Sequence, residues 1–184
     1  VLQGKGDWLF FSDGRTVDDI SGLRPFSEAD LEGWRTLLTG RRDWLRERGI
    51  RYLFVIPPDK QSVCAEHLPD WLLARARKPQ RLDQFLSYMR AHSDVPILDL
   101  REALLDAKKI RQVYLRTDSH WNERGAFTAY CRIVQAIAAL GIPATAPARG
   151  AFSDPPPHHP AAAPPRMLGP QGTPPGTARP APPP

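Results

Sequence analysis

The chain is poor in cysteine and has no long apolar stretch. Its two cysteines, Cys64 and Cys131, lie far apart and lack the spacing of a metal-binding motif. The longest apolar run, about residues 52–56, is much shorter than the roughly 20 residues that cross a bilayer. These absences predict no membrane span and no cysteine-based metal site, and they leave the redox compartment open.

A basic surface of the kind that binds nucleic acid is also absent. The formal net charge is +5, but acidic residues are scattered among the basic ones. No stripe of lysine and arginine interleaved with aromatic residues occurs, although nucleic-acid-binding surfaces commonly carry one. We therefore expect no nucleic-acid partner.

The chain lacks a recognisable serine nucleophile. Neither Gly-Asp-Ser nor Gly-x-Ser-x-Gly occurs in it, and the second of these places a catalytic serine on a sharp strand-to-helix turn. Ser153 is followed almost at once by three prolines and has no such setting. We assign no nucleophile in this chain.

Prolines divide the chain into two parts of different composition. Of the 21 prolines, 15 lie from Pro143 onward, where large apolar residues are scarce. Such a segment cannot bury enough apolar surface to offset the entropy of folding. We predict a folded domain over residues 1–142 and a disordered tail, rich in Pro, Ala and Gly, over residues 143–184. A natural linker and out-of-frame translation of a GC-rich gene both fit the tail, and we favour the second.

Helical and extended patterns alternate within residues 1–142. Ser27 and Asp30 resemble a capping box ahead of a long amphipathic helix. Residues 50–56 form a run rich in β-branched and aromatic residues, of the kind found in a central strand of a parallel sheet, and residues 95–98 form a second strand. This order predicts an α/β fold: a three-layer α/β/α sandwich with a mainly parallel sheet, incomplete at its C-terminus.

Two later elements carry more detailed expectations. Asp99 is expected to be the N-cap of the helix that follows it, in preference to a catalytic role. The last helix starts at about Glu123 and is expected to turn Phe127 and Tyr130 inward, with Cys131 in the core.

Residues 117–122 read Thr-Asp-Ser-His-Trp-Asn and carry the strongest chemical signal. If Asp118 to His120 is extended, the two side chains lie on one side of the chain. The carboxylate could then orient an imidazole that acts as a general base. The alternative is that Asp118 caps the following helix while His120 packs beside Trp121. Metal-dependent hydrolysis lacks visible further ligands, so we expect no metal and no cofactor.

Lys60 and Arg116 are weaker candidates for substrate binding. Lys60 follows the carboxyl end of a strand, where sites in α/β proteins commonly lie, but a solvated lysine in a turn fits the sequence as well. Arg116 lies close to Asp118 in the sequence. We favour a structural ion pair between Arg116 and Asp118 over a contact with substrate.

Three motifs follow one another in the order of a known family. Residues 4–10 read Gly-Lys-Gly-Asp-Trp-Leu-Phe, residues 54–60 read Phe-Val-Ile-Pro-Pro-Asp-Lys, and residues 117–122 carry the Asp-x-His-Trp element. Over residues 1–140 the chain resembles the SGNH hydrolase-like domain of the alginate O-acetyltransferases, the AlgX/AlgJ type. The Asp-x-His-Trp element is the most specific of the three.

This resemblance implies a Ser-His-Asp triad that transfers acetyl groups to hydroxyls of an exported polysaccharide, such as alginate, in the bacterial periplasm. His120 would be the base and Asp118 its orienting carboxylate. The family's serine lies in a later Gly-Asp-Ser segment, which this sequence does not contain. We therefore expect a truncated copy that is inactive alone.

The resemblance also implies partners: the exported polysaccharide, a membrane protein that donates acetyl groups, and proteins of an export complex. A non-catalytic polysaccharide-binding or scaffold module of such a complex is the alternative function. Because the chain begins at Val1 and not at a methionine, a signal peptide or anchor missing from this sequence stays an open alternative.

Overall fold

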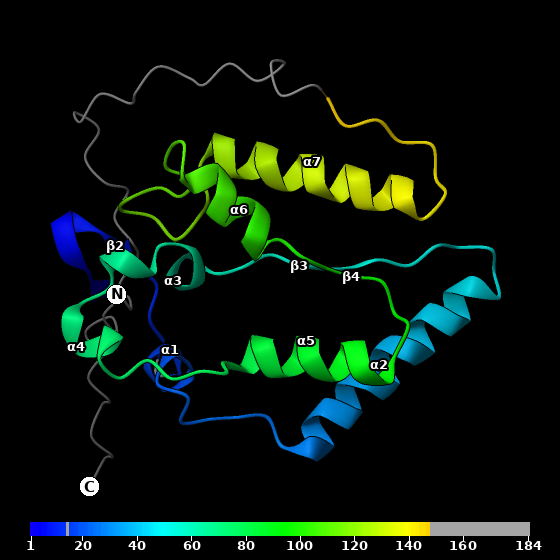
Figure 1. The fold of residues 1–184 in the computed structure, drawn as a ribbon, viewed down its shortest axis with the longest axis horizontal. Helices are drawn as coiled ribbons and strands as arrows, with labels where there is room; N and C mark the ends of the chain where they lie inside the picture. Colours follow the sequence, from blue (N-terminus) through cyan, green and yellow to red (C-terminus); the bar gives the residue numbers. More distant parts are fainter. Residues whose placement is uncertain (14, 148–184) are drawn as a thin grey trace, which may run out of the picture. The chain divides into compact units, whose positions relative to one another are not determined.

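A computed structural model describes residues 1–13 and 15–147 (Figure 1). The chain divides into two units, Val1–Asp154 and Pro155–Pro184, and the description below concerns the first. Most of the tail predicted from residue 143 onward lies outside the described residues, so the domain boundary and the disorder of the tail stay predictions.

The chain starts with a short β-hairpin. Strands β1 (Leu2–Gln3) and β2 (Leu9–Phe10) pair antiparallel, with Leu2 opposite Phe10, around a 3₁₀ turn, η1 (Lys5–Asp7). Gly6 in this turn has a φ of +58°, a conformation that glycine adopts without steric cost.

A parallel strand pair forms the centre of the fold. Strands β3 (Phe54–Ile56) and β4 (Ile97–Asp99) pair in parallel, with Phe54 opposite Ile97 and Val55 opposite Leu98. Val55 and Leu98 pack against one hydrophobic cluster, whereas Phe54 and Ile97 pack against another. Both faces of the strands are therefore covered, and for this reason apolar residues follow one another without alternation.

Helices cover both faces of this pair. Figure 1 shows α2 (Glu28–Arg46) and α5 (Arg81–His92) on one side, and α6 (Arg101–Lys108) and α7 (Glu123–Ala139) on the other. The predicted α/β class and the layered order of helix, sheet and helix are confirmed. The shorter helices are α1 (Thr16–Ile20), α3 (Lys60–Val63), η2 (Ala65–His67) and α4 (Asp70–Leu73). Within the described ranges, no helix combines the length and the apolar character that a membrane span requires.

The predicted central strand is shorter and less enclosed than expected. In the described part of the chain β3 has one neighbour, β4, and residues 50–53 pair with no strand. The reason lies at the end of α2, where the amide of Ile50 donates to the carbonyl of Leu45 at 3.0 Å and Gly49 has a φ of +71°. Ile50, the first residue of the predicted strand, therefore belongs to the C-terminal cap of α2 and not to the sheet.

Helix α7 buries a different face from the predicted one. Tyr130 is 51% exposed and Cys131 is only partly buried, whereas Gly125 and Ala129 are buried. A Cβ atom on Gly125 would lie 2.2 Å from the carbonyl oxygen of Val113. The helix therefore approaches the chain through its smallest residues, and a pattern based on large apolar residues gave the wrong face.

The start of α6 also differs in detail from the expectation. The N-cap is Leu100, and Asp99 is the last residue of β4. The Asp99 carboxylate still accepts a hydrogen bond from the backbone N–H of Arg101 at 3.0 Å and another from its Nε at 2.7 Å. Asp99 thus lies one residue before the N-cap, and its carboxylate still bonds to the first residue of the helix.

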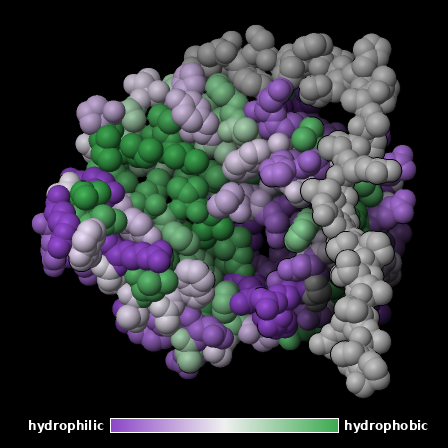
Figure 2. All heavy atoms as spheres, turned by 180° about the vertical axis from the view of Figure 1, so that it is seen from behind, coloured by the Kyte–Doolittle hydropathy of each residue, from purple (hydrophilic) through white to green (hydrophobic). Residues whose placement is uncertain are grey.

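Some large apolar side chains lie at the surface. Trp34, Leu37 and Trp44 are between 37% and 55% exposed, and their spacing places them on one side of α2. Figure 2 shows hydrophobic residues gathered on the face that is turned away in Figure 1. Contiguous apolar area of this kind is commonly a contact surface.

Candidate active site

The Asp-x-His-Trp element lies in a tight loop just before α7. At the base of the loop, Tyr114 and Trp121 form an antiparallel bridge, and the amide of Asn122 donates to the carbonyl of Val113 at 3.0 Å. The amide of Leu115 donates to the carbonyl of His120 at 3.1 Å. The two ends of the loop are thus bonded to each other, and Asp118 lies at its tip.

Asp118 and His120 form a hydrogen-bonded pair. The Oδ1 atom of Asp118 lies 2.6 Å from Nδ1 of His120 and accepts the backbone N–H of the same residue at 2.8 Å. The expected pairing is present, but the chain bends here and is not extended, because an aspartate that bonds two residues ahead closes a turn. Since Nδ1 contacts the carboxylate, Nε2 is the nitrogen that can act as a base.

The alternative roles of the pair do not fit this geometry. The N-cap of α7 is Asn122, whose Oδ1 accepts the amide of Gly125 at 3.0 Å. The His120 side chain is 78% exposed, so it is not packed against Trp121. Asp118 therefore neither caps the helix nor serves a buried histidine.

The carboxylate of Asp118 should add a pH-dependent contribution to stability. Hydrogen bonds from the backbone and then from the ring of His120 keep the pKa of Asp118 below its usual value. The contribution is therefore present above the unfolded-state value of about 3.9 and is lost as pH falls through the folded value. We expect D118N to lower the free energy of unfolding at neutral pH but not in strong acid. Urea titrations of both proteins would measure this, and a loss independent of pH would contradict it.

Lys60 is not placed to contact a substrate. Its side chain is 1% exposed, so the solvated-turn interpretation was wrong. Its Nζ donates to the backbone carbonyls of Leu9, Arg116 and Asp118 at 2.6, 2.8 and 3.0 Å. Since an ammonium has three hydrogens, none is left for a ligand.

Arg116 contributes through its backbone. Its carbonyl oxygen accepts the amide of Leu9 at 2.9 Å in addition to the Lys60 ammonium. Its side chain is exposed, and among the described residues the Asp118 carboxylate pairs with His120 in place of Arg116. The expected ion pair is therefore not formed.

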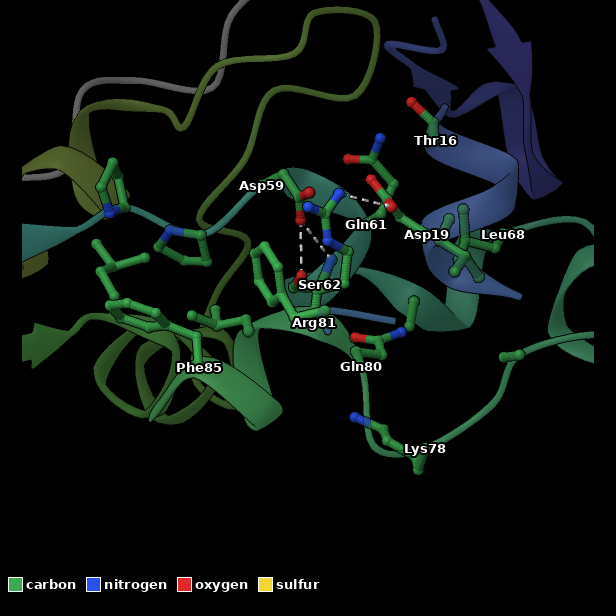
Figure 3. Close-up of a pocket in the computed structure, with 18 of the residues that line it drawn as sticks. Thr16, Asp19, Asp59, Gln61, Ser62, Leu68, Lys78, Gln80, Arg81 and Phe85 are labelled. Atoms are coloured by element: carbon green, nitrogen blue, oxygen red, sulfur yellow. Dashed lines mark hydrogen bonds and ion pairs between the residues drawn. The ribbon is translucent and has the colours of Figure 1, made fainter. Parts of the chain in front are cut away.

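A pocket of about 550 Å³ opens beside the carboxyl end of β3 (Figure 3). On its polar side, Ser62 donates to Asp59 at 2.6 Å, and Arg81 contacts Asp19 at 3.4 Å and stacks 4.1 Å from the Phe26 ring. The apolar lining includes Ile20, Trp34, Phe54, Ile56, Leu68 and Phe85. Asp118 and His120 do not line this pocket.

Within the described residues, no cluster of three or more His, Cys, Asp or Glu side chains could hold a metal ion.

Sequence reasoning missed several residues of this region. Asn122 directly precedes an acidic residue and a helical pattern, so its cap could have been found. The hydroxyl of Tyr114 donates to the carbonyl of Pro58 at 2.5 Å, and Arg81 contacts Asp19 at the pocket. These two contacts join segments far apart in the chain, and no local pattern predicts them.

The comparisons with known proteins identify the family of this chain. A family model described as "SGNH hydrolase-like domain, acetyltransferase AlgX" matches residues 1–173. The chain belongs to this family. It is 31% identical over 143 residues to the "Probable alginate O-acetylase AlgJ" of Pseudomonas syringae. This match covers 75% of this chain and 33% of the relative. The protein of the same name from Pseudomonas aeruginosa is 30% identical over 133 residues, with coverage of 72% and 32%.

Two solved structures have the same fold over the matched part of the chain. The O-acetyltransferase domain of Pseudomonas putida AlgJ is 29% identical, with a TM-score of 0.52 and coverage of 77% of this chain and 48% of that one. Bacillus cereus PatB1, solved with a sulfonyl adduct, has a TM-score of 0.54 at 22% identity and covers 76% and 44%. The present chain spans about a third of the curated relatives and less than half of each solved chain.

Proposed function

We propose that this chain supplies the His-Asp part of a site that transfers acetyl groups to hydroxyls of an exported polysaccharide such as alginate. The observation that carries the proposal is the 2.6 Å contact between Asp118 and His120, found in a chain of the AlgX family. The exposure of the imidazole supports the proposal, because a general base must reach the hydroxyl whose proton it accepts.

The chemistry follows from the two ring nitrogens of His120. In the proposed reaction Nε2 accepts the proton of a serine hydroxyl as its oxygen attacks the acetyl carbonyl, and the donor leaves with that proton. Nε2 then accepts the proton of an acceptor hydroxyl as its oxygen attacks the carbonyl of the acetyl-serine, and it returns that proton to the serine oxygen as the acetyl group leaves. Asp118 keeps the proton of the neutral ring on Nδ1 and stabilises the imidazolium formed in each step.

The remaining parts of the apparatus are proposed to come from elsewhere. No serine of this chain has a Gly-Asp-Ser setting, so we propose that the chain alone is inactive. We also propose a periplasmic location, with an acetyl-donating membrane protein and export-complex proteins as partners, because the AlgX/AlgJ resemblance implies them.

A chimera tests the proposal. Residues 1–142 would replace the matching part of the P. putida AlgJ O-acetyltransferase domain, which the chain resembles at 29% identity. We expect the chimera to transfer acetyl groups from a chromogenic ester to alginate oligosaccharides, and the 184-residue chain alone to do so no faster than buffer. A folded chimera without turnover, beside an active parent domain, would contradict the proposal.

A polysaccharide-binding module is the second candidate function, and the pocket at β3 favours it. Aromatic walls with Arg, Asp and Gln at the rim suit a small polar ligand. Under this proposal the 184-residue chain binds alginate oligosaccharides without turnover, and R81M weakens binding. Calorimetric titration of both proteins would measure this, and equal affinities would argue against a role for the pocket.

A further inference from the structure

Lys60 connects two segments that are far from it in the sequence. It is the first residue of α3, and its ammonium contacts Leu9 on the N-terminal hairpin and both Arg116 and Asp118 on the loop of the site. The rings of Trp8 and Phe10 lie 4.7 and 4.9 Å from the same nitrogen. A buried cation enclosed by carbonyl oxygens and aromatic faces therefore lies beneath the loop.

Burial of this charge carries an energetic cost that its contacts must offset. Burial lowers the pKa of Lys60 to about 8, while the nearby Cys64 and Asp118 raise it. An unpaired ammonium at this depth would be strongly unfavourable. Three hydrogen bonds from a charged donor are each stronger than bonds between neutral groups. The carbonyl of Asp118 is one of the three acceptors, so the backbone of the site takes part in this compensation.

The tip of the loop depends on this contact more than its base does. The base is joined by the Tyr114–Trp121 bridge and by the bond from Asn122 to Val113. Arg116 and Thr117 are exposed, and they lie beyond these cross-loop bonds. The contacts of Lys60 with the carbonyls of Arg116 and Asp118 therefore connect the tip to the body of the protein.

We propose that Lys60 is a positioning residue for the His-Asp pair: its ammonium fixes the backbone of Asp118, which keeps the carboxylate within reach of His120 Nδ1. This inference rests on the proposed function for the role of the pair. Lys60 touches neither substrate nor acyl group, and it acts through the peptide backbone alone.

The substitution K60M tests the proposal in the 184-residue chain. Methionine keeps an unbranched apolar stem and removes all three donors. We expect hydrogen exchange at the backbone amide of His120, which donates to Asp118 Oδ1, to become about tenfold faster or more, the effect of losing a hydrogen bond from a charged donor. K108M is the matched control, because the ammonium of Lys108 also donates to a backbone carbonyl, that of Val63 on α3, and to the carboxylate of Glu66. The control should leave exchange at His120 unchanged.

A measurement on the wild-type chain covers the case in which K60M does not fold. NMR couplings across hydrogen bonds should join Lys60 Nζ to the carbonyl carbons of Leu9, Arg116 and Asp118. On warming below the unfolding transition, these couplings and the protection of the His120 amide should be lost together. Unchanged exchange in a folded K60M, or loss of His120 protection while the couplings persist, would overturn the proposal. These readouts need no turnover, so they can fail while the acyl-transfer proposal stands, and the reverse also holds.

Discussion

The substitution H120A in the AlgJ chimera is expected to reduce acetyl transfer by roughly 10³-fold or more, the scale seen when a member of a catalytic triad is removed. The reason is that His120 Nε2 accepts the proton in both steps of the proposed reaction. The rate of ester turnover at saturating substrate measures the effect. The loss should appear in kcat more than in KM, because proton transfer belongs to the transition state.

A matched histidine separates this effect from general damage. H92A removes a ring that packs against Tyr88 at the end of α5, away from the loop of the site. It should leave turnover within about twofold of the parent chimera, as expected for a surface change of small energetic effect. Equal losses in H120A and H92A would mean that His120 contributes only to folding.

The substitution G125A is expected to destabilise the chain by about 2–3 kcal/mol, as overpacking does when the neighbour is backbone. The added Cβ would lie 2.2 Å from the carbonyl oxygen of Val113 and 2.9 Å from the Cβ of Trp121. That carbonyl also accepts the amide of Asn122, so the base of the loop would have to move. Urea denaturation followed by circular dichroism measures the change.

Gly33 provides the opposite control on another helix. It lies within α2, is exposed, and an added Cβ would meet no atom within 4 Å. G33A should therefore stabilise the chain by about 0.5–1 kcal/mol through helix propensity. If both substitutions stabilised the chain, the close approach of α7 to Val113 would be wrong.

Features with a local physical cause were predictable from the sequence. The capping box of α2 forms as expected. The backbone amide of Ser27 donates to the Asp30 carboxylate at 3.0 Å, and the backbone amide of Asp30 donates to the Ser27 hydroxyl oxygen at 3.1 Å. The two parallel strands also follow from their apolar runs. In both cases the signal lies within a few neighbouring residues.

Features that depend on distant segments were not predictable in this way. The burial of Lys60 requires carbonyls that lie more than 50 residues away, and Lys60 alone gives no sign of them. The inward face of α7 is set by contact with Val113, which favours Gly125 over Tyr130. A periodicity argument counts large apolar residues, so it cannot detect a close approach of two backbones.

The candidate site combines both cases. The spacing of Asp118 and His120 predicted their contact, because residues two apart can bond in an extended chain and also in an aspartate turn. The sequence did not distinguish these two backbones. The turn is closed by the bridge between Tyr114 and Trp121 and by the bond from Asn122 to Val113. The contact with Lys60 connects it to a further segment of the chain.

The proposed role of Asp118 is to hold the proton of the neutral His120 ring on Nδ1. ¹⁵N NMR of the His120 ring in the 184-residue chain and in its D118N variant tests it most directly, at a pH where the imidazole is neutral. We expect a proton on Nδ1 in the wild-type chain, because the hydrogen bond of a ring nitrogen sets the tautomer, and a shift toward the Nε2–H form in D118N. A wild-type ring protonated at Nε2, or the same tautomer in both proteins, would show that Asp118 does not orient the His120 ring in this way.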